Sequence, residues 1–372
     1  MKEHPLLYIV PLFHFLPPSG SLAKKSLNGG AVYKGSLFFE VRNVMFHYFT
    51  KMEFIVIAFQ LNSFDGDKGL TINNNVLKPV PSRDQVLVEV YAASINPIDR
   101  SISQGYLKEM LHLPVTLGGD FSGVVIEVGE AVSNFKKGDK VYGQAIVLNG
   151  GTGSFAQFVV ANADNTAIQP NQIYFVDAAS LPLAGASALQ ALEGHIQIKP
   201  DQKILIHGGA GGIGSLAVQI AKSHGAFVAA TASANDLNYV LSLGADKVID
   251  YQSEKFEDIL KHYDAVFDTF SGDTTARSFK ILKKGGILVS MLAPPDQALA
   301  EKYQVTAIGQ MTNTNTKKLN HLTDLVNAGK VKPQVAKVFP LDQTLEAFKY
   351  LAEGHPKGKV VIKIKTDINR IN

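Results

Sequence analysis

The sequence predicts an α/β protein in which a doubly wound parallel sheet is joined to a β-rich domain. Strands and helices alternate from about residue 177 to residue 325, and a glycine-rich turn connects one of these strands to a helix. Short strands separated by glycines occupy the region from about residue 52 to residue 175. Alternation builds a parallel sheet covered on both faces, whereas many short strands favour a compact, barrel-like domain.

The size and composition of the chain fit two domains of ordinary size. It has 372 residues, of which 46% are hydrophobic and 19% are charged, so a sizeable core is expected. The net charge is +3 and the basic residues are scattered, which argues against nucleic acid as a partner. No stretch reaches the ~18 apolar residues of a membrane helix. The absence of cysteine excludes disulfides, thiolate metal sites and a cysteine nucleophile.

Residues 1–51 are expected to be an extension outside the fold. The apolar stretch 6–16 precedes a segment that faintly resembles a signal-peptide cleavage site, but Pro11 and His14 interrupt it. Met52 is followed by an apolar segment at 54–59 that is typical of a first strand, so we take Met52 as the functional start. A real targeting segment is the alternative; otherwise we expect a cytoplasmic protein.

Period-two patterns and glycines mark the strands of the β-rich domain. Strands are expected at 85–91, 123–128 and 155–161, and β character returns with a helix at 341–354 and a strand at 359–365. In the alternating region the expected strands are 203–207, 226–231, 247–249, 264–267, 286–290 and 304–308. A helix is expected at 212–224, because apolar residues recur there with helical spacing.

Three glycines mark the turn after the strand 203–207. Their pattern, Gly209-x-Gly211-x-x-Gly214, lies between a predicted strand and a predicted helix, which is the context that a dinucleotide-binding turn requires. Gly209 is expected to permit the tight turn, Gly211 to admit the pyrophosphate, and Gly214 to bring helix and strand close together. The helix N-terminus offers N–H groups and a positive dipole to the phosphates. The expected binding residues are Gly209, Ala210, Gly211, Gly212, Ile213 and Gly214.

The end of the second strand bears on the choice of dinucleotide. An NAD site usually has Asp or Glu there, about 20 residues after the motif. Here the strand runs into small residues ending at Ser233, which leaves room for a 2′-phosphate and favours NADPH. No Arg or Lys follows, and Asp236 would repel the phosphate, so NADH remains the alternative. Ser233 is expected to contact the cofactor, unless it merely ends the strand.

Further motifs stand in a fixed order along the chain. They are Asn96-Pro97-Ile98-Asp99, Gly118-Gly119-Asp120-Phe121-Ser122-Gly123, Gly138-Asp139-Lys140-Val141, Leu181-Pro182-Leu183-Ala184-Gly185, Leu243-Gly244-Ala245-Asp246 and Gly358-Lys359-Val360-Val361. With the glycine turn they resemble the medium-chain dehydrogenase/reductase superfamily, in its zinc-free quinone oxidoreductase or enone reductase branch. The resemblance runs from Met52 to about Lys365.

This resemblance implies a GroES-like β-rich catalytic domain and a Rossmann dinucleotide-binding domain. We assign residues 52–176 and 330–372 to the first and residues 177–329 to the second. Zinc members of the superfamily have a Cys in the first block and a His-Glu pair where Gly119-Asp120 stands here; this chain has neither. We therefore expect no metal site, with the histidines in surface or structural positions. The resemblance also implies a homodimer through an edge strand of the Rossmann domain.

Two residues of the β-rich domain are the catalytic candidates that the resemblance implies. Asn96 is expected near the nicotinamide end, the alternative being an Asx-turn before Pro97. Tyr106 is expected to be a polar wall or a proton donor, the alternative being a packed aromatic. The family often has another Tyr near Ser101, and its absence weakens any mechanism that depends on a tyrosine.

Three more residues are implied to contact the cofactor. Ser187 resembles a nicotinamide-phosphate contact, Tyr251 an adenosine-side contact, and Lys359 a phosphate contact near the domain boundary. The alternatives are a helix-terminal serine, a surface tyrosine and a solvated lysine.

The combined prediction is an NADPH-dependent oxidoreductase that transfers hydride to a quinone or an α,β-unsaturated carbonyl. Such acceptors need no Lewis acid, because the conjugated carbonyl takes up the developing charge and hydrogen-bond donors stabilise it. The proton can come from a Tyr or from water. The alternative is a dinucleotide-binding sensor or structural protein with little turnover. The sequence does not identify the individual substrate, because pocket residues without geometry say little.

Overall fold

The structure, a computed structural model, describes residues 55–366 of the chain. The expected extension at 1–51, the expected start at Met52 and the alternative of a targeting segment lie outside these residues.

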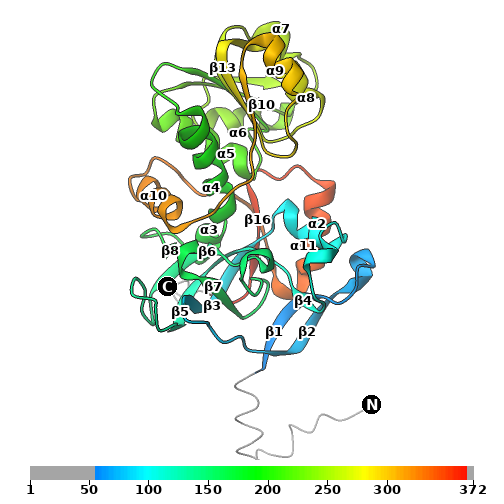
Figure 1. Cartoon of the computed structure of the whole chain (residues 1–372), viewed down its shortest axis with the longest axis vertical. Helices are drawn as coiled ribbons and strands as arrows, with labels where there is room; N and C mark the ends of the chain where they lie inside the picture. Colours follow the sequence, from blue (N-terminus) through cyan, green and yellow to red (C-terminus); the bar gives the residue numbers. More distant parts are fainter. Residues whose placement is uncertain (1–54, 367–372) are drawn as a thin grey trace, which may run out of the picture. The chain divides into compact units, whose positions relative to one another are not determined.

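Within the described residues, one sheet has six strands, all parallel, in the order β11-β10-β9-β12-β13-β14 (Figure 1). The strands are β9 (Lys203–His207), β10 (Phe227–Ala232), β11 (Lys247–Asp250), β12 (Tyr263–Asp268), β13 (Leu282–Ser290) and β14 (Thr306–Gly309). The strand order reverses between β9 and β12. Open α/β sheets bind their ligands beyond the carboxyl ends of the strands at such a point, and the glycine turn follows β9 there.

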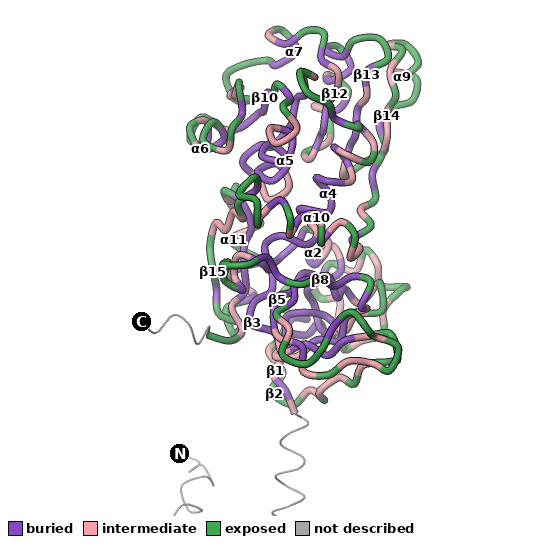
Figure 2. The backbone as a smooth tube through the Cα atoms, turned by 90° about the vertical axis from the view of Figure 1, so that its left-hand side faces the viewer, coloured by how far each residue is buried: buried purple, intermediate pink, exposed green. Residues whose placement is uncertain are grey.

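Helices cover both faces of this sheet, as expected for a doubly wound fold. They are α5 (Gly212–Ser223), α6 (Leu237–Ser242), α7 (Phe256–Ile259), α8 (Asp273–Ser278) and α9 (Gln297–Tyr303). The central strand β9 shows the reason. Ile204 and Ile206 pack in one core cluster with α5, whereas Leu205 packs in another with Phe256 and Phe279. Both faces of β9 are therefore buried, and Figure 2 draws the neighbouring strand β12 and helix α5 mainly as buried.

The remaining strands form a β-rich region. Among the described residues, one sheet has the order β15-β16-β3-β5-β6-β8, with β7 also paired to β3, and a second has the order β2-β1-β4. The strands are β1 (Ile55–Leu61), β2 (Leu70–Leu77), β3 (Gln85–Ser94), β4 (Val115–Thr116), β5 (Asp120–Val128), β6 (Lys140–Gln144), β7 (Phe158–Asn162), β8 (Thr166–Ile168), β15 (Val335–Pro340) and β16 (Lys359–Lys363). β7 begins later than expected, because Phe155 bonds instead to Leu117 and Phe59.

The other helices lie beside the β-rich region or between it and the six-stranded sheet. They are α2 (Pro97–Ser103), α3 (Phe175–Ala179), α4 (Pro182–Leu189) with its π-helical continuation η7 (Gln190–Ile196), α10 (Thr316–Asn327) and α11 (Thr344–Glu353). In Figure 1, α4 and α10 lie between the six-stranded sheet and the strands β1 to β8. The expected helix at 341–354 is α11 preceded by a 3₁₀ turn at Leu341–Gln343.

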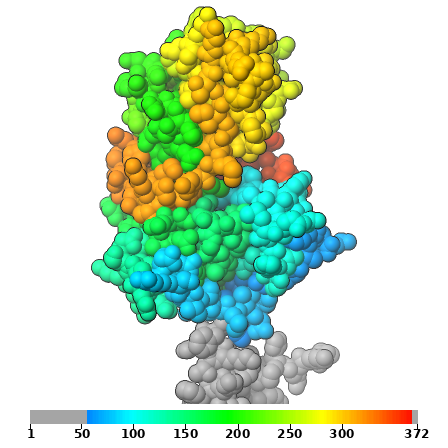
Figure 3. Space-filling model, viewed as in Figure 1, coloured from blue at the N-terminus to red at the C-terminus, as the bar shows by residue number. Residues whose placement is uncertain are grey.

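Helix α10 contacts both regions (Figure 3). The hydroxyl of Tyr142 donates to the Leu319 carbonyl at 2.6 Å, and the hydroxyl of Thr316 donates to the Thr166 carbonyl at 2.7 Å. On its other side α10 meets α4 so closely that a Cβ on Gly185 would lie 2.2 Å from Leu322 Cδ2. We retain the boundaries at 176/177 and 329/330 as a proposal, with α10 as the element shared by both regions.

Candidate active site

The turn after β9 contains five glycines, and the one with a positive φ is not the one expected. Gly208 has φ +70°, whereas Gly209 has no positive φ, so Gly208 makes the tight turn. Gly209 is required for another reason. A Cβ there would lie 2.9 Å from the Ala230 Cβ and 3.1 Å from a Val240 methyl, which would push the turn away from β10 and α6. The role expected for Gly209 is therefore corrected.

Gly214 and Gly211 have opposite surroundings. A Cβ on Gly214 would lie 2.1 Å from the Gly208 carbonyl oxygen, so Gly214 does let α5 pack closely on the turn. A Cβ on Gly211 would meet only that same oxygen, at 3.4 Å. Gly211 thus faces open space, and no side chain of residues 55–366 caps the α5 N-terminus. Helix N-terminal N–H groups that lack partners bind anions, so the turn fits the pyrophosphate of a dinucleotide.

A distant segment is attached to this turn. The Gly358 N–H donates to the Ala210 carbonyl at 2.9 Å, and Gly211 and Gly358 form an isolated parallel bridge. The next side chain, Lys359, passes so near that a Cβ on Gly212 would lie 2.7 Å from its Cδ. Gly212 is therefore the position where the C-terminal strand reaches the dinucleotide turn.

The Lys359 side chain ends in a buried polar cluster. This cluster consists of Asn96, Asp99, Asp120 and Lys359, and we call it the Asn96 cluster. The Asn96 Nδ2 donates to Asp120 Oδ2 at 2.8 Å, and Lys359 Nζ donates to Asn96 Oδ1 and to the Ile95 carbonyl, the latter at 2.7 Å. These partners fix the orientation of the amide, because a carboxylate accepts and an ammonium only donates. Asp99 Oδ2 accepts the Asn96 backbone N–H at 2.8 Å.

Burial dominates the electrostatics of the Asn96 cluster. It raises the pKa of Asp99 to about 7, and the nearby Asp120 charge adds to the rise. Burial also raises the pKa of Asp120 and lowers that of Lys359, because each charged form loses its hydration, while their mutual attraction opposes both shifts. Asp99 Oδ1 has no hydrogen-bond partner within the part of the chain that the structure describes. Two carboxyl groups thus face one ammonium, and a proton on Asp99 makes the cluster neutral.

The Asn96 cluster does not fit a zinc ion. Lys359 Nζ lies 3.8 Å from Asp120 Oδ2, so an ammonium already occupies the position beside this carboxylate. Asp120 is also engaged by Ser94 and by the Leu183 N–H. Among the described residues no three His, Asp or Glu side chains are grouped so as to hold a metal ion. His224 and His321 do share the Glu193 carboxylate, at 2.9 Å each, which their separation in sequence did not indicate.

Tyr106 is exposed, whereas Ser187 is buried. Tyr106 is 77% exposed, on the turn after α2. Ser187 lies within α4 and is fully buried; its hydroxyl donates to the Leu183 carbonyl at 2.7 Å and lies 2.8 Å from the Thr312 hydroxyl. Their predicted roles stay predictions.

Polar atoms without partners gather near Ser187. Gln310 follows β14 and donates from Nε2 to the Ser187 carbonyl at 3.0 Å, while its Oε1 is buried and has no partner among the described residues. The hydroxyl of Ser290, at the end of β13, is also buried and unpaired. Buried polar atoms normally have partners. Both lie at carboxyl ends of the parallel strands, the edge at which the glycine turn also lies, and they fit the polar end of a bound ligand.

The carboxyl end of β10 holds an ion pair. Ser233 follows β10, and its hydroxyl donates to Asp236 Oδ2 at 2.7 Å. The other carboxylate oxygen of Asp236 lies 3.0 Å from Lys357 Nζ. Tyr251 is about half exposed, and its N–H donates to the Ala232 carbonyl at 3.2 Å, so it stands beside the end of β10. The sequence segment after Ser233 lacks a base, but the fold brings one from residue 357.

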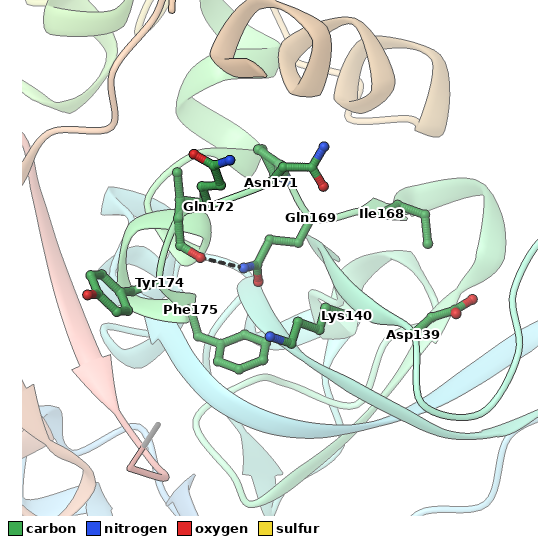
Figure 4. A pocket seen from close by; sticks show the side chains of 10 residues that line it. Asp139, Lys140, Ile168, Gln169, Asn171, Gln172, Tyr174 and Phe175 are labelled. Atoms are coloured by element: carbon green, nitrogen blue, oxygen red, sulfur yellow. Dashed lines mark hydrogen bonds between the residues drawn. The ribbon is translucent and has the colours of Figure 1, made fainter. Parts of the chain in front are cut away.

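A cavity of about 400 Å³ lies elsewhere, in the β-rich region (Figure 4). Figure 4 shows Gln169 donating to the Ile173 carbonyl, with Lys140 and Phe175 beside it. None of the residues that line this cavity belongs to the glycine turn or to the Asn96 cluster. It is therefore separate from the candidate active site.

Comparison with known proteins identifies the family. The description "Alcohol dehydrogenase GroES-like domain" matches residues 82–171, and "Zinc-binding dehydrogenase" matches residues 243–362. The chain is 38% identical over 317 residues to the chloroplastic NADPH-dependent alkenal/one oxidoreductase of Arabidopsis thaliana, covering 82% of this chain and 78% of that one. The chain belongs to the medium-chain dehydrogenase/reductase superfamily.

Solved structures agree with this family. The quinone oxidoreductase of Coxiella burnetii superposes with a TM-score of 0.76 at 34% identity, over 84% of this chain and 100% of that chain. The Escherichia coli quinone oxidoreductase in complex with NADPH gives a TM-score of 0.74 at 27% identity, over 83% of this chain and 100% of that chain. The expected fold, a GroES-like domain with a Rossmann domain, is confirmed.

Sequence reasoning missed several residues of the site. Asp99 and Asp120 stand in two of the sequence motifs but had no predicted role, although an acid in each of these two motifs was a usable signal. Lys357 was missed, because no local pattern relates residue 357 to the end of β10. The unpaired Gln310 carbonyl had no signal at all, since burial without a partner appears only in three dimensions.

Proposed function

We propose that this protein is an NADPH-dependent reductase that transfers hydride to a quinone or an α,β-unsaturated carbonyl without zinc. The observation that carries the proposal is the open, uncapped turn at Gly211 in a chain of this family. The names of its relatives, an NADPH-dependent alkenal/one oxidoreductase and two quinone oxidoreductases, indicate the kind of acceptor. NADH is the alternative cofactor.

The residues present fit a bound dinucleotide. The α5 N-terminus would hold the pyrophosphate, and Ser187 and Gln310 would hold the nicotinamide end with their buried polar atoms. When bound, the reduced nicotinamide supplies the hydride. Holding both reactants together supplies much of the rate acceleration, because it converts an encounter into an intramolecular step.

The Asn96 cluster would stabilise the substrate oxygen that gains charge. Asp120 and Lys359 hold the Asn96 amide in one orientation, and Nδ2 has a second N–H beyond the one donated to Asp120. A fixed donor aimed at a developing enolate lowers the barrier, since it needs no reorganisation during the step. The final proton would come from Tyr106, which is exposed to solvent, or from water.

The test is NADPH oxidation by the purified full chain with a panel of quinones and enones. We expect consumption with at least one member of either class and little with saturated aldehydes or alcohols. A matched variant, Tyr106→Phe, removes only a hydroxyl from an exposed ring, so its fold should be unchanged. If Tyr106 donates the proton, kcat should fall by about 10²-fold; an unchanged kcat assigns the proton to water. Clear NADPH binding without turnover on any panel member would contradict the proposal and favour a dinucleotide-binding protein.

The absence of zinc from the reaction rests on the residues themselves. The chain has no cysteine, and Lys359 stands beside Asp120. We expect elemental analysis of the purified, active protein to find far less than one zinc per chain, and chelators to leave its activity unchanged. Stoichiometric zinc that is needed for turnover would contradict this part of the proposal.

We also propose a cytoplasmic homodimer that pairs through an edge strand of the six-stranded sheet. The edge strands are β11 and β14. No helix among the described residues is long and apolar enough to cross a membrane. Sedimentation of the purified chain should give twice the mass of one chain, and a tagged full-length protein should fractionate with the cytoplasm.

A further inference from the structure

The end of β10 combines an acid and a base from distant parts of the chain. Asp236 follows β10 and is only 6% exposed, so its charge is largely removed from water. Lys357 Nζ lies 3.0 Å from Asp236 Oδ1 and donates to the Asn235 carbonyl at 3.0 Å. The Lys357 side chain is 47% exposed, so its ammonium keeps an open side. An ammonium in this position can neutralise the Asp236 carboxylate on its buried side and still bind a second anion on its exposed side.

The backbone holds Lys357 at this place. Its neighbour Gly358 has φ +96° and donates its N–H to the Ala210 carbonyl in the glycine turn. A Cβ on Gly358 would lie 2.2 Å from the Gln334 carbonyl oxygen, so the segment passes through a narrow gap. Lys357 is therefore fixed between the turn that fits the pyrophosphate and the strand end that faces the adenosine ribose.

Asp236 is not arranged as the acid of an NAD site. Such an acid needs a free oxygen to accept the ribose hydroxyl. Here Oδ2 accepts from the Ser233 hydroxyl at 2.7 Å, and Oδ1 is paired with Lys357. Both oxygens of the Asp236 carboxylate are therefore engaged and do not accept a ribose hydroxyl. The Lys357 ammonium beside them is the charged group that remains partly exposed.

We propose that Lys357 is the residue that selects NADPH over NADH, by neutralising Asp236 and offering its ammonium to the 2′-phosphate of the cofactor. The inference rests on the proposed dinucleotide function and assigns the base that the segment after Ser233 lacks. The contact joins residues separated by more than a hundred positions, at the place where the sequence alone shows only an acid.

The test measures binding, not turnover. The dissociation constants of NADPH and NADH are obtained from the fluorescence of the reduced nicotinamide; the chain contains no Trp that would interfere. In Lys357→Met we expect NADPH to bind about tenfold more weakly, with NADH unchanged, because one charge-assisted contact is lost. In Asp236→Asn we expect NADPH to bind several-fold more tightly and NADH equally well, because the competing acid is gone. Lys349→Met, on α11, is the control for total charge and should change neither.

The double variant Lys357→Met with Asp236→Asn separates the two roles of the lysine. If Lys357 contacts the phosphate, the double variant still binds NADPH several-fold more weakly than Asp236→Asn alone. Equal NADPH affinities of these two variants would overturn the direct contact, since Lys357 would then only cancel Asp236. An unchanged ratio of NADPH to NADH affinity in Lys357→Met, or weaker NADH binding in Asp236→Asn, would also overturn it. Failure of the unaltered chain to bind either dinucleotide would contradict the proposed function instead.

Discussion

The glycine turn and the Asn96 cluster lie against each other, yet they are built in opposite ways. The turn is formed by the backbone of one short segment, residues 208–214. Its glycines are required mainly because a side chain at several of these positions would clash with neighbouring atoms. The cluster is made by side chains from three segments, with Asn96, Asp120 and Lys359 as their members. A backbone site requires particular residues at fixed spacing and is therefore visible in sequence. A side-chain site requires only that the fold bring the residues together.

Substitutions in the glycine turn and in the Asn96 cluster should have different effects. The largest loss of stability is expected in the cluster. In Lys359→Met, Asp120 loses its buried cation and Asn96 loses a donor. Leaving a buried charge without its partner costs about 3–5 kcal/mol of unfolding free energy, which urea denaturation measures. The matched control is Lys365→Met, whose partner Glu89 is partly exposed, and which should cost under about 1 kcal/mol. Equal losses in the two variants would contradict the distinction, whereas adding Asp120→Asn to Lys359→Met should recover part of the loss.

Gly214→Ala tests the turn as a packing device. The new Cβ would lie 2.1 Å from the Gly208 carbonyl oxygen, so α5 must move away from the turn. Overpacking of this kind costs about 1–3 kcal/mol, and dinucleotide binding should be lost with it. Thermal unfolding and cofactor titration measure the two effects. A variant that is as stable as the unaltered chain would show that α5 can shift freely and that the turn is not rigid.

Asp99→Asn tests the charge balance of the cluster through pH. Burial raises the pKa of Asp99 to about 7, above its unfolded value, so the folded state holds this proton more tightly. The stabilisation from this proton is complete below the unfolded pKa and is lost as pH rises towards 7. Between pH 5 and pH 7 the unaltered chain should lose about 2 kcal/mol relative to Asp99→Asn, because each pKa unit corresponds to ~1.4 kcal/mol. Urea denaturation at several pH values gives this difference, and parallel pH profiles for the two chains would refute the raised pKa.

Gly211→Ala is expected to have the smallest effect on stability and to sharpen the comparison most. Its φ of −75° suits alanine, and the new Cβ would meet only the Gly208 oxygen at 3.4 Å. Stability should change by under about 0.5 kcal/mol, as for other unobstructed sites. Binding of NADPH should weaken by about tenfold, or ~1.4 kcal/mol, because the methyl occupies the space next to the pyrophosphate. An unchanged affinity for NADPH would show that the pyrophosphate does not lie next to Gly211.

The sequence alone determined the fold class, the alternation of strands and helices along the chain and the position of the dinucleotide turn. These features follow from periodicity and from glycine spacing, which are local properties. Even there, the reason for one glycine was wrong: Gly208 takes the left-handed conformation, and Gly209 is needed to avoid β10. The residue types alone do not show which of two adjacent glycines has the positive φ.

Only the tertiary structure decided how charge is arranged around that turn. It placed Lys359 in the buried Asn96 cluster and Lys357 beside Asp236, although the two lysines are two positions apart in the sequence. The physical reason is that charge pairing depends on distance and burial, and neither is encoded in the spacing of residues along the chain. The sequence determined that a dinucleotide turn exists; the fold determined which charges surround it.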